Sequence, residues 1–264
     1  MSGIATESKE VNQLLQHVAN GEQDEAETWI KKYPGFLLCK GNVTDLSKRE
    51  FKDITAFQYA VWALDWHMWK MLLKYMPAAS AAEQLAELEA RGTAHGKHAS
   101  WQGLIDAYGR YETYRNEKNY SACEAVWVRG IRGSQLLLPA HVVNEYCHET
   151  RAFYPLPDFS EIDVLPRSRK CGGVDWYDQR HGRSGKEWAN YRGGMPGSHQ
   201  KVSRDAFLSP RGPSCLLAQH INTNNLIFII KLILSIERKI FIKEGLIKKA
   251  FPQESRKALT NNII

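Results

Sequence analysis

The sequence predicts a mainly α-helical fold: a stack of helix–turn–helix pairs at the N-terminus, additional helices, and an irregular α+β C-terminal region. Apolar residues recur at helical spacing in most segments before residue 150. Two capping residues, Thr55 and Asp65, divide one such segment into two short helices. After Glu149, prolines and glycines interrupt the helical pattern.

The segment 55–76 is the clearest of these pairs. Thr55 can begin a helix by accepting a hydrogen bond from a backbone N–H two or three residues on. The two helices repeat one apolar spacing, carried by Phe57, Ala60, Val61 and Leu64 and then by Met68, Trp69, Leu72, Leu73 and Met76. This spacing predicts two short helices packed through one face.

A second, similar pair is predicted upstream. Val11–Asn20 and Glu22–Tyr33 form its helices, Gly21 makes the turn between them, and Pro34 ends the second helix. If Gly21 is aligned with Leu64, Trp29-Ile30 falls over Leu72-Leu73. The two pairs are then expected to pack side by side as equivalent layers.

The residues between the two pairs predict a β-hairpin that projects as a finger. Within Phe36–Asp53, the segments Asn42–Asp45 and Arg49–Lys52 can pair around a turn at Leu46-Ser47-Lys48.

These pairs resemble the ankyrin repeat, whose opening is Thr-Pro-Leu-His-x-Ala and whose second helix carries Val-Val-x-Leu-Leu. The matching residues are Thr55, Ala56, Phe57, Gln58 and Ala60, then Leu64-Asp65, then Met68, Trp69, Leu72 and Leu73. Ala56 replaces Pro, Gln58 replaces His, and Leu64 stands where the family has the glycine of its turn. The resemblance implies a scaffold that binds a partner protein.

The predicted organisation has four parts, 1–78, 79–150, 151–215 and 216–264. Residues 79–150 are expected to be a helical extension with helices at Ser80–Ala90, Trp101–Tyr114, Cys123–Ile131 and Leu136–His148. Residues 151–215 are expected to be irregular, with short strands around Val174–Tyr177 and Glu187–Tyr191.

The tail 216–264 differs from the rest in composition and charge. It contains eleven of the seventeen isoleucines. It also has eight Lys/Arg and three Glu, which accounts for +5 of the net charge of +6. A nucleic-acid groove in the body is therefore not expected. The apolar run 226–236 is interrupted by Lys231 and is too short to span a bilayer. A basic amphipathic helix within 226–249, docked on the body or on a membrane surface, fits better.

Cysteine usage and the N-terminus bear on the compartment. The five cysteines are scattered without a CxxC motif, which favours a reducing environment and gives no cysteine metal site. Residues 1–12 are polar and charged, which is not typical of a signal peptide, so a cytoplasmic location in the producing cell is expected.

One helical segment carries a candidate metal site. His141, Glu145 and His148 are spaced i, i+4 and i+7, which places them on one helix face, and imidazole and carboxylate are zinc ligands. The alternative is a polar helix face opposite Val142 and Val143. No cofactor is expected.

Cysteine and histidine residues between 123 and 181 offer a second chemical hypothesis. Cys147 is adjacent to His148, and Cys171, Asp175, Asp178 and His181 lie together in a glycine-rich stretch. A hydrolase or transferase could use such a Cys/His site. A buried, unreactive cysteine is the alternative.

The divergent repeats and the helical extension also resemble ankyrin-type effectors that intracellular bacteria secrete into host cells. LPAHVVNEYCH followed by FYPLPDF is similar to a block in that group. The resemblance implies a host protein as the partner, bound through the finger and the exposed parts of Trp62, Trp66 and His67. A membrane-surface adaptor that acts through the basic tail is the other alternative.

Overall fold

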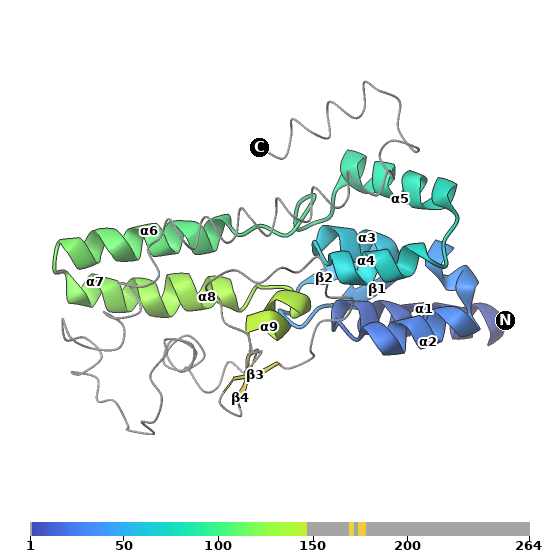
Figure 1. The fold of residues 1–264 in the computed structure, drawn as a ribbon, viewed down its shortest axis with the longest axis horizontal. Coiled ribbons are helices and arrows are strands. Elements are labelled where there is room, and N and C mark those ends of the chain that lie inside the picture. The colour runs from blue at the N-terminus through green and yellow to red at the C-terminus, as the bar shows by residue number, and fades with distance from the viewer. Residues whose placement is uncertain (1, 147–168, 172–173, 178–264) are drawn as a thin grey trace.

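The computed structural model describes residues 2–146, 169–171 and 174–177 (Figure 1). Helices account for 65% of these residues, which confirms the mainly α prediction. One hydrophobic core takes its residues from 11–99 and a second from 101–177. We call these parts the first lobe and the second lobe. In Figure 1 the long paired helices of the second lobe extend away from the first lobe.

The first helical hairpin consists of α1 (Ser2–Ala19) and α2 (Gln23–Lys32). Leu14, Leu15 and Val18 are buried, as the apolar spacing predicts. Helix α1 begins at Ser2 rather than at the predicted Val11, because the segment before Val11 contains no proline and continues the same helix.

The second helical hairpin consists of α3 (Ala56–Trp62) and α4 (Trp66–Leu73). Both predicted caps are confirmed. The Thr55 hydroxyl accepts a hydrogen bond from the Gln58 N–H at 3.1 Å, and the Gln58 side chain accepts one from the Thr55 N–H at 3.1 Å. The Asp65 carboxylate accepts a hydrogen bond from the Met68 N–H at 3.1 Å. Capping satisfies backbone donors that the first turn of a helix leaves unpaired.

The two hairpins turn in the same way. Gly21 donates to the Val18 carbonyl and Glu22 to the His17 carbonyl, and this i−3 and i−5 pattern is a Schellman motif. Leu64 and Asp65 repeat it with the carbonyls of Val61 and Ala60. The left-handed residue is Gly21 (φ 72°) in the first turn and Leu64 (φ 61°) in the second.

The two hairpins pack against each other in parallel order, since α1 contacts α3 and α2 contacts α4. Ile30 of α2 and Leu72 of α4 are both completely buried in the core of the first lobe. Trp29 and Leu73 are partly buried against that core.

A β-hairpin projects between the two helical hairpins. A 3₁₀ helix (Pro34–Leu38) leads into β1 (Gly41–Thr44), which pairs antiparallel with β2 (Glu50–Ile54) in the register Val43↔Phe51. The predicted pairing of these two segments around a turn is therefore confirmed. Val43 and Phe51 face the core.

Helix α5 (Ala78–Arg91) packs on α3 and is followed by Gly92 as its C-cap, so it extends the predicted helix Ser80–Ala90 at both ends. The connector to the second lobe passes back over α3, where the Ala99 N–H donates to the Trp62 carbonyl at 2.7 Å.

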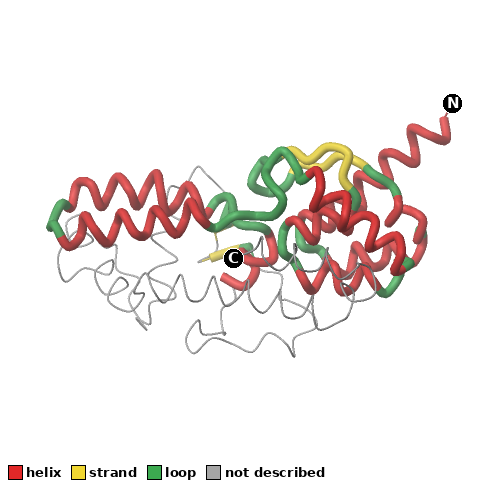
Figure 2. The backbone as a smooth tube through the Cα atoms, turned by 90° about the horizontal axis from the view of Figure 1, so that it is seen from above, coloured by secondary structure: helices red, strands yellow, loops and turns green. Residues whose placement is uncertain are grey.

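The second lobe is built on two long antiparallel helical rods that lie side by side in both views (Figures 1 and 2). One rod is α6 (Gln102–Asn116), and the other runs through α7 (Tyr120–Ala125), a π-helical segment (Val126–Ile131) and α8 (Arg132–Gln135). The helix predicted at Cys123–Ile131 is thus longer at both ends. A Cβ on Gly130 would lie 3.1 Å from the Ala107 Cβ, so glycine permits this close approach.

Helix α9 (Ala140–Tyr146) packs against both hairpin turns of the first lobe. A Cβ on Gly21 would lie 3.4 Å from Ala140 and Asn144, and the His141 Nδ1 is 3.8 Å from the Asp65 Oδ2. The predicted helix Leu136–His148 is shorter in the structure, because Leu136–Leu138 form turns before Pro139, and its last residues lie outside the described residues.

Two short strands, β3 (Lys170–Cys171) and β4 (Val174–Asp175), pair next to α9. The Trp176 indole N–H donates to the Gln135 carbonyl at 3.0 Å, and the Tyr177 hydroxyl donates to the Leu138 carbonyl at 2.6 Å. The strand predicted near Val174 is confirmed in part, whereas Glu187–Tyr191 and the tail 216–264 lie outside the described residues.

Within the described ranges, no helix has both the length and the apolar character needed to cross a membrane.

Candidate functional site

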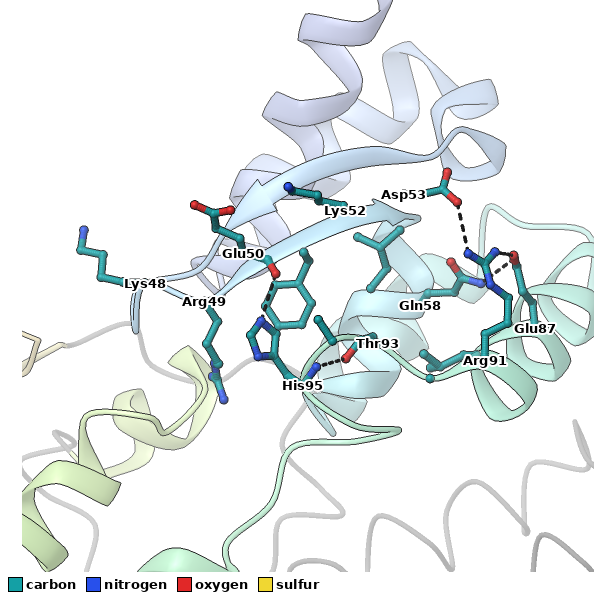
Figure 3. Close-up of a pocket in the computed structure, with 15 residues that line it drawn as sticks. Lys48, Arg49, Glu50, Lys52, Asp53, Gln58, Glu87, Arg91, Thr93 and His95 are labelled. Atoms are coloured by element: carbon teal, nitrogen blue, oxygen red, sulfur yellow. Dashed lines mark hydrogen bonds and ion pairs between the residues drawn. The ribbon is translucent and has the colours of Figure 1, made fainter.

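A groove of about 570 Å³ lies between the β-hairpin and α5 in the first lobe (Figure 3). One wall is the segment 48–54, which includes all of β2. The opposite wall is the end of α5 and the turn 92–95, and Gln58 of α3 contributes from below. The groove therefore joins two stretches that are distant in sequence, 48–58 and 87–95. We call it the finger groove.

The turn of the β-hairpin is organised by one buried carboxylate. Asp45 accepts hydrogen bonds from the Ser47 hydroxyl at 2.6 Å and from the Arg49 N–H at 3.0 Å. Its other oxygen pairs with the Arg49 guanidinium at 2.8 Å. Lys48 takes the left-handed conformation that closes the turn, with φ 69°. The local sequence therefore holds Lys48 and β2 at the rim of the groove.

The α5 wall carries an ion-pair network centred on Glu87. Its carboxylate accepts hydrogen bonds from Lys40 at 2.5 Å, from Gln58 at 3.0 Å and from Arg91 at 2.6 Å. These bonds, led by the one from Lys40, lower the pKa of Glu87 to about 2. Glu87 is therefore ionised at physiological pH, and its charge is already neutralised within the network.

At the other end of the groove, His95 connects the turn 92–95 to β2. Its Nε2 lies 2.9 Å from the Glu50 carbonyl oxygen, and because a carbonyl only accepts, Nε2 is the donor. The imidazole packs edge-on against Phe51, with ring centroids 4.9 Å apart. This contact orients the ring toward the strand.

Two cations at the rim lack a charged partner among the described residues. Lys48 and Lys52 are exposed and form no ion pair there, whereas Arg49 and Arg91 pair with Asp45 and Glu87. Glu50 is the acidic residue of the wall that is likewise unpaired within the described ranges. The groove can therefore bind a ligand that carries negative charge.

The described lining of the groove contains no cysteine or serine, and its one histidine is bonded to a backbone carbonyl. The one lining carboxylate with a shifted pKa is more acidic than usual, which does not suit a general base at neutral pH. The groups that the described lining offers to a ligand are therefore mainly charged side chains and the backbone of β2.

The structure corrects the binding residues predicted from the sequence. Trp62 is 1% exposed and His67 is 4% exposed, so neither side chain is available to a partner. Trp62 lies under the β-hairpin, with the Phe51 ring 4.6 Å and the Arg49 guanidinium 4.7 Å from it. Trp66 begins α4, but its side chain lies outside the described residues.

The predicted metal residues do not assemble within the described residues. His141 faces Asp65 in the interior, and burial lowers the pKa of its imidazole. Glu145 lies on α9, although its side chain is outside the described part, as is His148 altogether. Within the described ranges, no three potential ligands come together. The predicted alternative, a polar helix face, is also wrong for His141, because α9 packs that residue against the first lobe.

The cysteine hypothesis is tested only at Cys123. This residue is buried, and burial raises the pKa of its thiol, which does not favour a thiolate nucleophile. Cys147, Asp178 and His181 lie outside the described residues, and Cys171 and Asp175 belong to the short strands β3 and β4.

Sequence reasoning missed the groove residues Lys52, Arg91 and His95. The connector 93–98 stands out for its two histidines, but no local signal placed His95 against β2. That contact spans 45 residues. Only packing of α5 on α3 creates it.

Comparison with known proteins identifies one related family. A family profile described as the CBUA0006 C-terminal domain matches residues 103–215, which begin in α6 of the second lobe. An uncharacterized protein, CBUA0006, of Coxiella burnetii (strain RSA 493 / Nine Mile phase I) is 31% identical over 242 residues, covering 74% of this chain and 71% of that protein. Because 74% of the chain is more than residues 103–264 contain, the similarity to this protein includes part of the first lobe. No solved structure matches the chain.

Proposed function

The chain belongs to the CBUA0006 family, and from this premise we propose that it is a protein-binding scaffold whose first lobe is an ankyrin-like stack. The finger groove is the surface that contacts the partner protein.

The observation that carries this proposal is the equivalence of the two helical hairpins. Both turn through a Schellman motif, and Gly21 corresponds to Leu64 as in the sequence alignment of the two pairs. Each helix of the first hairpin contacts its counterpart in the second, and Ile30 and Leu72 share one core. Stacked repeats of this kind offer partner proteins an extended surface formed by their loops and inner helices.

The chemistry of the finger groove is consistent with this role. Asp45 fixes the β-hairpin turn through Arg49, and Glu87 of the α5 wall pairs with Lys40 and Arg91, so each wall is formed before a partner arrives. Binding to a preformed surface costs less conformational entropy than binding to a flexible one.

The relative comes from a bacterium, which is compatible with the second part of the proposal: the scaffold is an effector that acts on a protein of a host cell. This part is supported by the resemblance to ankyrin-type effectors.

The proposal is tested by recovering partners from a eukaryotic lysate with the full chain. Wild type is compared with the double variant Lys48→Glu/Lys52→Glu, which reverses both unpaired rim charges. Lys9→Glu, on the exposed side of α1, is the matched control. We expect a host protein that wild type and the control retain, with at least a tenfold lower recovery by the double variant.

Equal recovery by all three proteins, or no specific recovery at all, would contradict the scaffold. Stoichiometric zinc in the purified chain, lost in His141→Ala, would support the hydrolase or transferase alternative instead.

A further inference from the structure

The two outer edges of the β-hairpin differ in how their backbone groups are satisfied. The edge of β1 is covered by α1: the Asn42 N–H donates to the Asn12 Oδ1 at 2.8 Å, and the Gln16 Nε2 donates to the Thr44 carbonyl at 3.2 Å. Asn12 and Gln16 are one helical turn apart, so α1 closes this edge with side chains.

The edge of β2 is open in its middle. Arg49 accepts from the Asp45 N–H, and Phe51 pairs with Val43, so the alternation of an antiparallel pair directs the backbone groups of Glu50 and the N–H of Lys52 away from β1. The register then shifts before Gly41↔Ile54, where Asp53 has a φ of 54°. The His95 side chain satisfies the Glu50 carbonyl. Within the described residues β1 and β2 form a two-stranded sheet, so no further strand pairs with this outer edge of β2.

The finger groove runs along this open edge. Its wall contains seven consecutive residues, 48–54. A strand that presented one face to a groove would contribute alternate residues, whereas consecutive residues indicate that its backbone edge lines the groove. Strand β2 has five residues, about 17 Å of edge.

The contacts that bridge the groove can open. Arg91 and Asp53 lie 3.7 Å apart across one end, and their side chains are 62% and 60% exposed. A pair this exposed contributes little to stability. At the other end, the His95 imidazole donates to Glu50 as the N–H of an added strand would.

We propose that an extended, acidic segment of the partner protein adds to the edge of β2 as a third strand. Main-chain hydrogen bonds to Lys52 supply the pairing, as in other cases of strand addition. The two rim lysines, Lys48 and Lys52, select for acidic side chains. The inference rests on the proposed function and specifies how the finger groove binds its partner.

The probe is a fluorescein-labelled hexapeptide of alternating Glu and Val, titrated with the full chain and followed by fluorescence anisotropy. Lys52→Pro removes an outward N–H that the β1–β2 pairing does not use. Thr44→Pro removes the equivalent outward N–H on the edge covered by α1 and is the matched control. Circular dichroism and the unfolding midpoint verify that both variants fold.

We expect saturable binding to wild type and to Thr44→Pro, with affinity at least tenfold lower for Lys52→Pro. The same peptide N-methylated at each residue should not bind, and a peptide of alternating Lys and Val should bind at least tenfold more weakly.

Binding by Lys52→Pro within twofold of wild type, or by the N-methylated peptide, would overturn strand addition. So would a dimer of the wild type that Lys52→Pro converts to monomer, because the occupant would then be a second copy of the chain. None of these results changes the recovery of a partner from the lysate. Failure of the strand-addition proposal can therefore be distinguished from failure of the proposed scaffold function.

Discussion

The two helical hairpins of the first lobe form the same turn from different residues. The first uses Gly21, for which a positive φ carries no steric penalty, and the second uses Leu64, for which it does. The second hairpin compensates with side-chain caps at Thr55 and Asp65, whereas Glu22 of the first makes no cap bond. The comparison shows that different residues can provide the same turn geometry.

The largest effect on stability is expected from the buried side chains of α2 and α4. We expect Ile30→Ala and Leu72→Ala each to lower the free energy of unfolding by about 3 kcal/mol, because both side chains are completely buried. Urea denaturation measures both variants and the double variant.

If α2 and α4 form one layer, the double variant should depart from additivity by more than about 0.5 kcal/mol. Additive losses would place the two residues in separate layers and break the comparison.

The second largest effect is expected from the N-terminal caps of the helices, which differ between the two hairpins. We expect Thr55→Ala to cost about 2 kcal/mol, since it removes the cap and also the hydrogen bond that the Thr55 hydroxyl donates to the buried Gln84 Oε1. Glu22→Ala should cost about 0.5 kcal/mol, because Glu22 makes a partly exposed pair with His17. Thr55→Ser is the control and should retain most of the stability. Equal losses for Thr55→Ala and Glu22→Ala would show that capping does not separate the hairpins.

Helix α9 contacts the two turns through different residues, and its contact with the second turn should make the stability of the chain depend on pH. Burial lowers the pKa of His141, which faces Asp65 of the second turn. Below pH 6.5 the unfolded chain therefore binds a proton that the folded chain does not, and stability falls as pH falls. The slope is at most about 1.4 kcal/mol per pH unit for one group.

Denaturant unfolding between about pH 7.5 and about pH 5.5, one unit on either side of the ordinary histidine pKa, measures this slope. His141→Gln should reduce it, and His98→Gln, at an exposed position, should leave it unchanged. An unchanged slope in His141→Gln would mean that this imidazole does not couple α9 to pH.

The smallest effects should come from exchanging the turn residues themselves. Leu64→Gly should stabilise the chain by about 0.5 kcal/mol, because glycine relieves the left-handed conformation. Gly21→Ala should destabilise it by about 1 kcal/mol for the same reason. Thermal unfolding resolves both, and a stabilising Gly21→Ala would indicate that the two turns are not equivalent.

The sequence predicted most local features of the first lobe and few of the contacts between its elements. Thr55, Asp65 and Gly92 mark helix ends through their own backbone or side-chain chemistry, so each could be found from its neighbours. The β-hairpin turn was found in the same way. Trp62 and His67 were wrongly expected at the surface, because the residues that cover Trp62 come from β2 and from the connector after α5.

The candidate site shows the same division. The basic side chains of β2 are visible in the sequence, but the groove exists only because α5 packs on α3 and brings Arg91 and His95 opposite that strand. The predicted metal face can be compared with the structure only at His141, which α9 packs against the turn of the second helical hairpin, facing Asp65.

The amino-acid order by itself determined the helices, their caps and the paired turns, since these depend on interactions over a few residues. The tertiary structure alone decided which edge of the β-hairpin is closed by α1 and which remains open. That choice depends on contacts across about thirty residues or more, such as Asn12 with Asn42 and Glu50 with His95. Local periodicity carries no information about contacts at that separation.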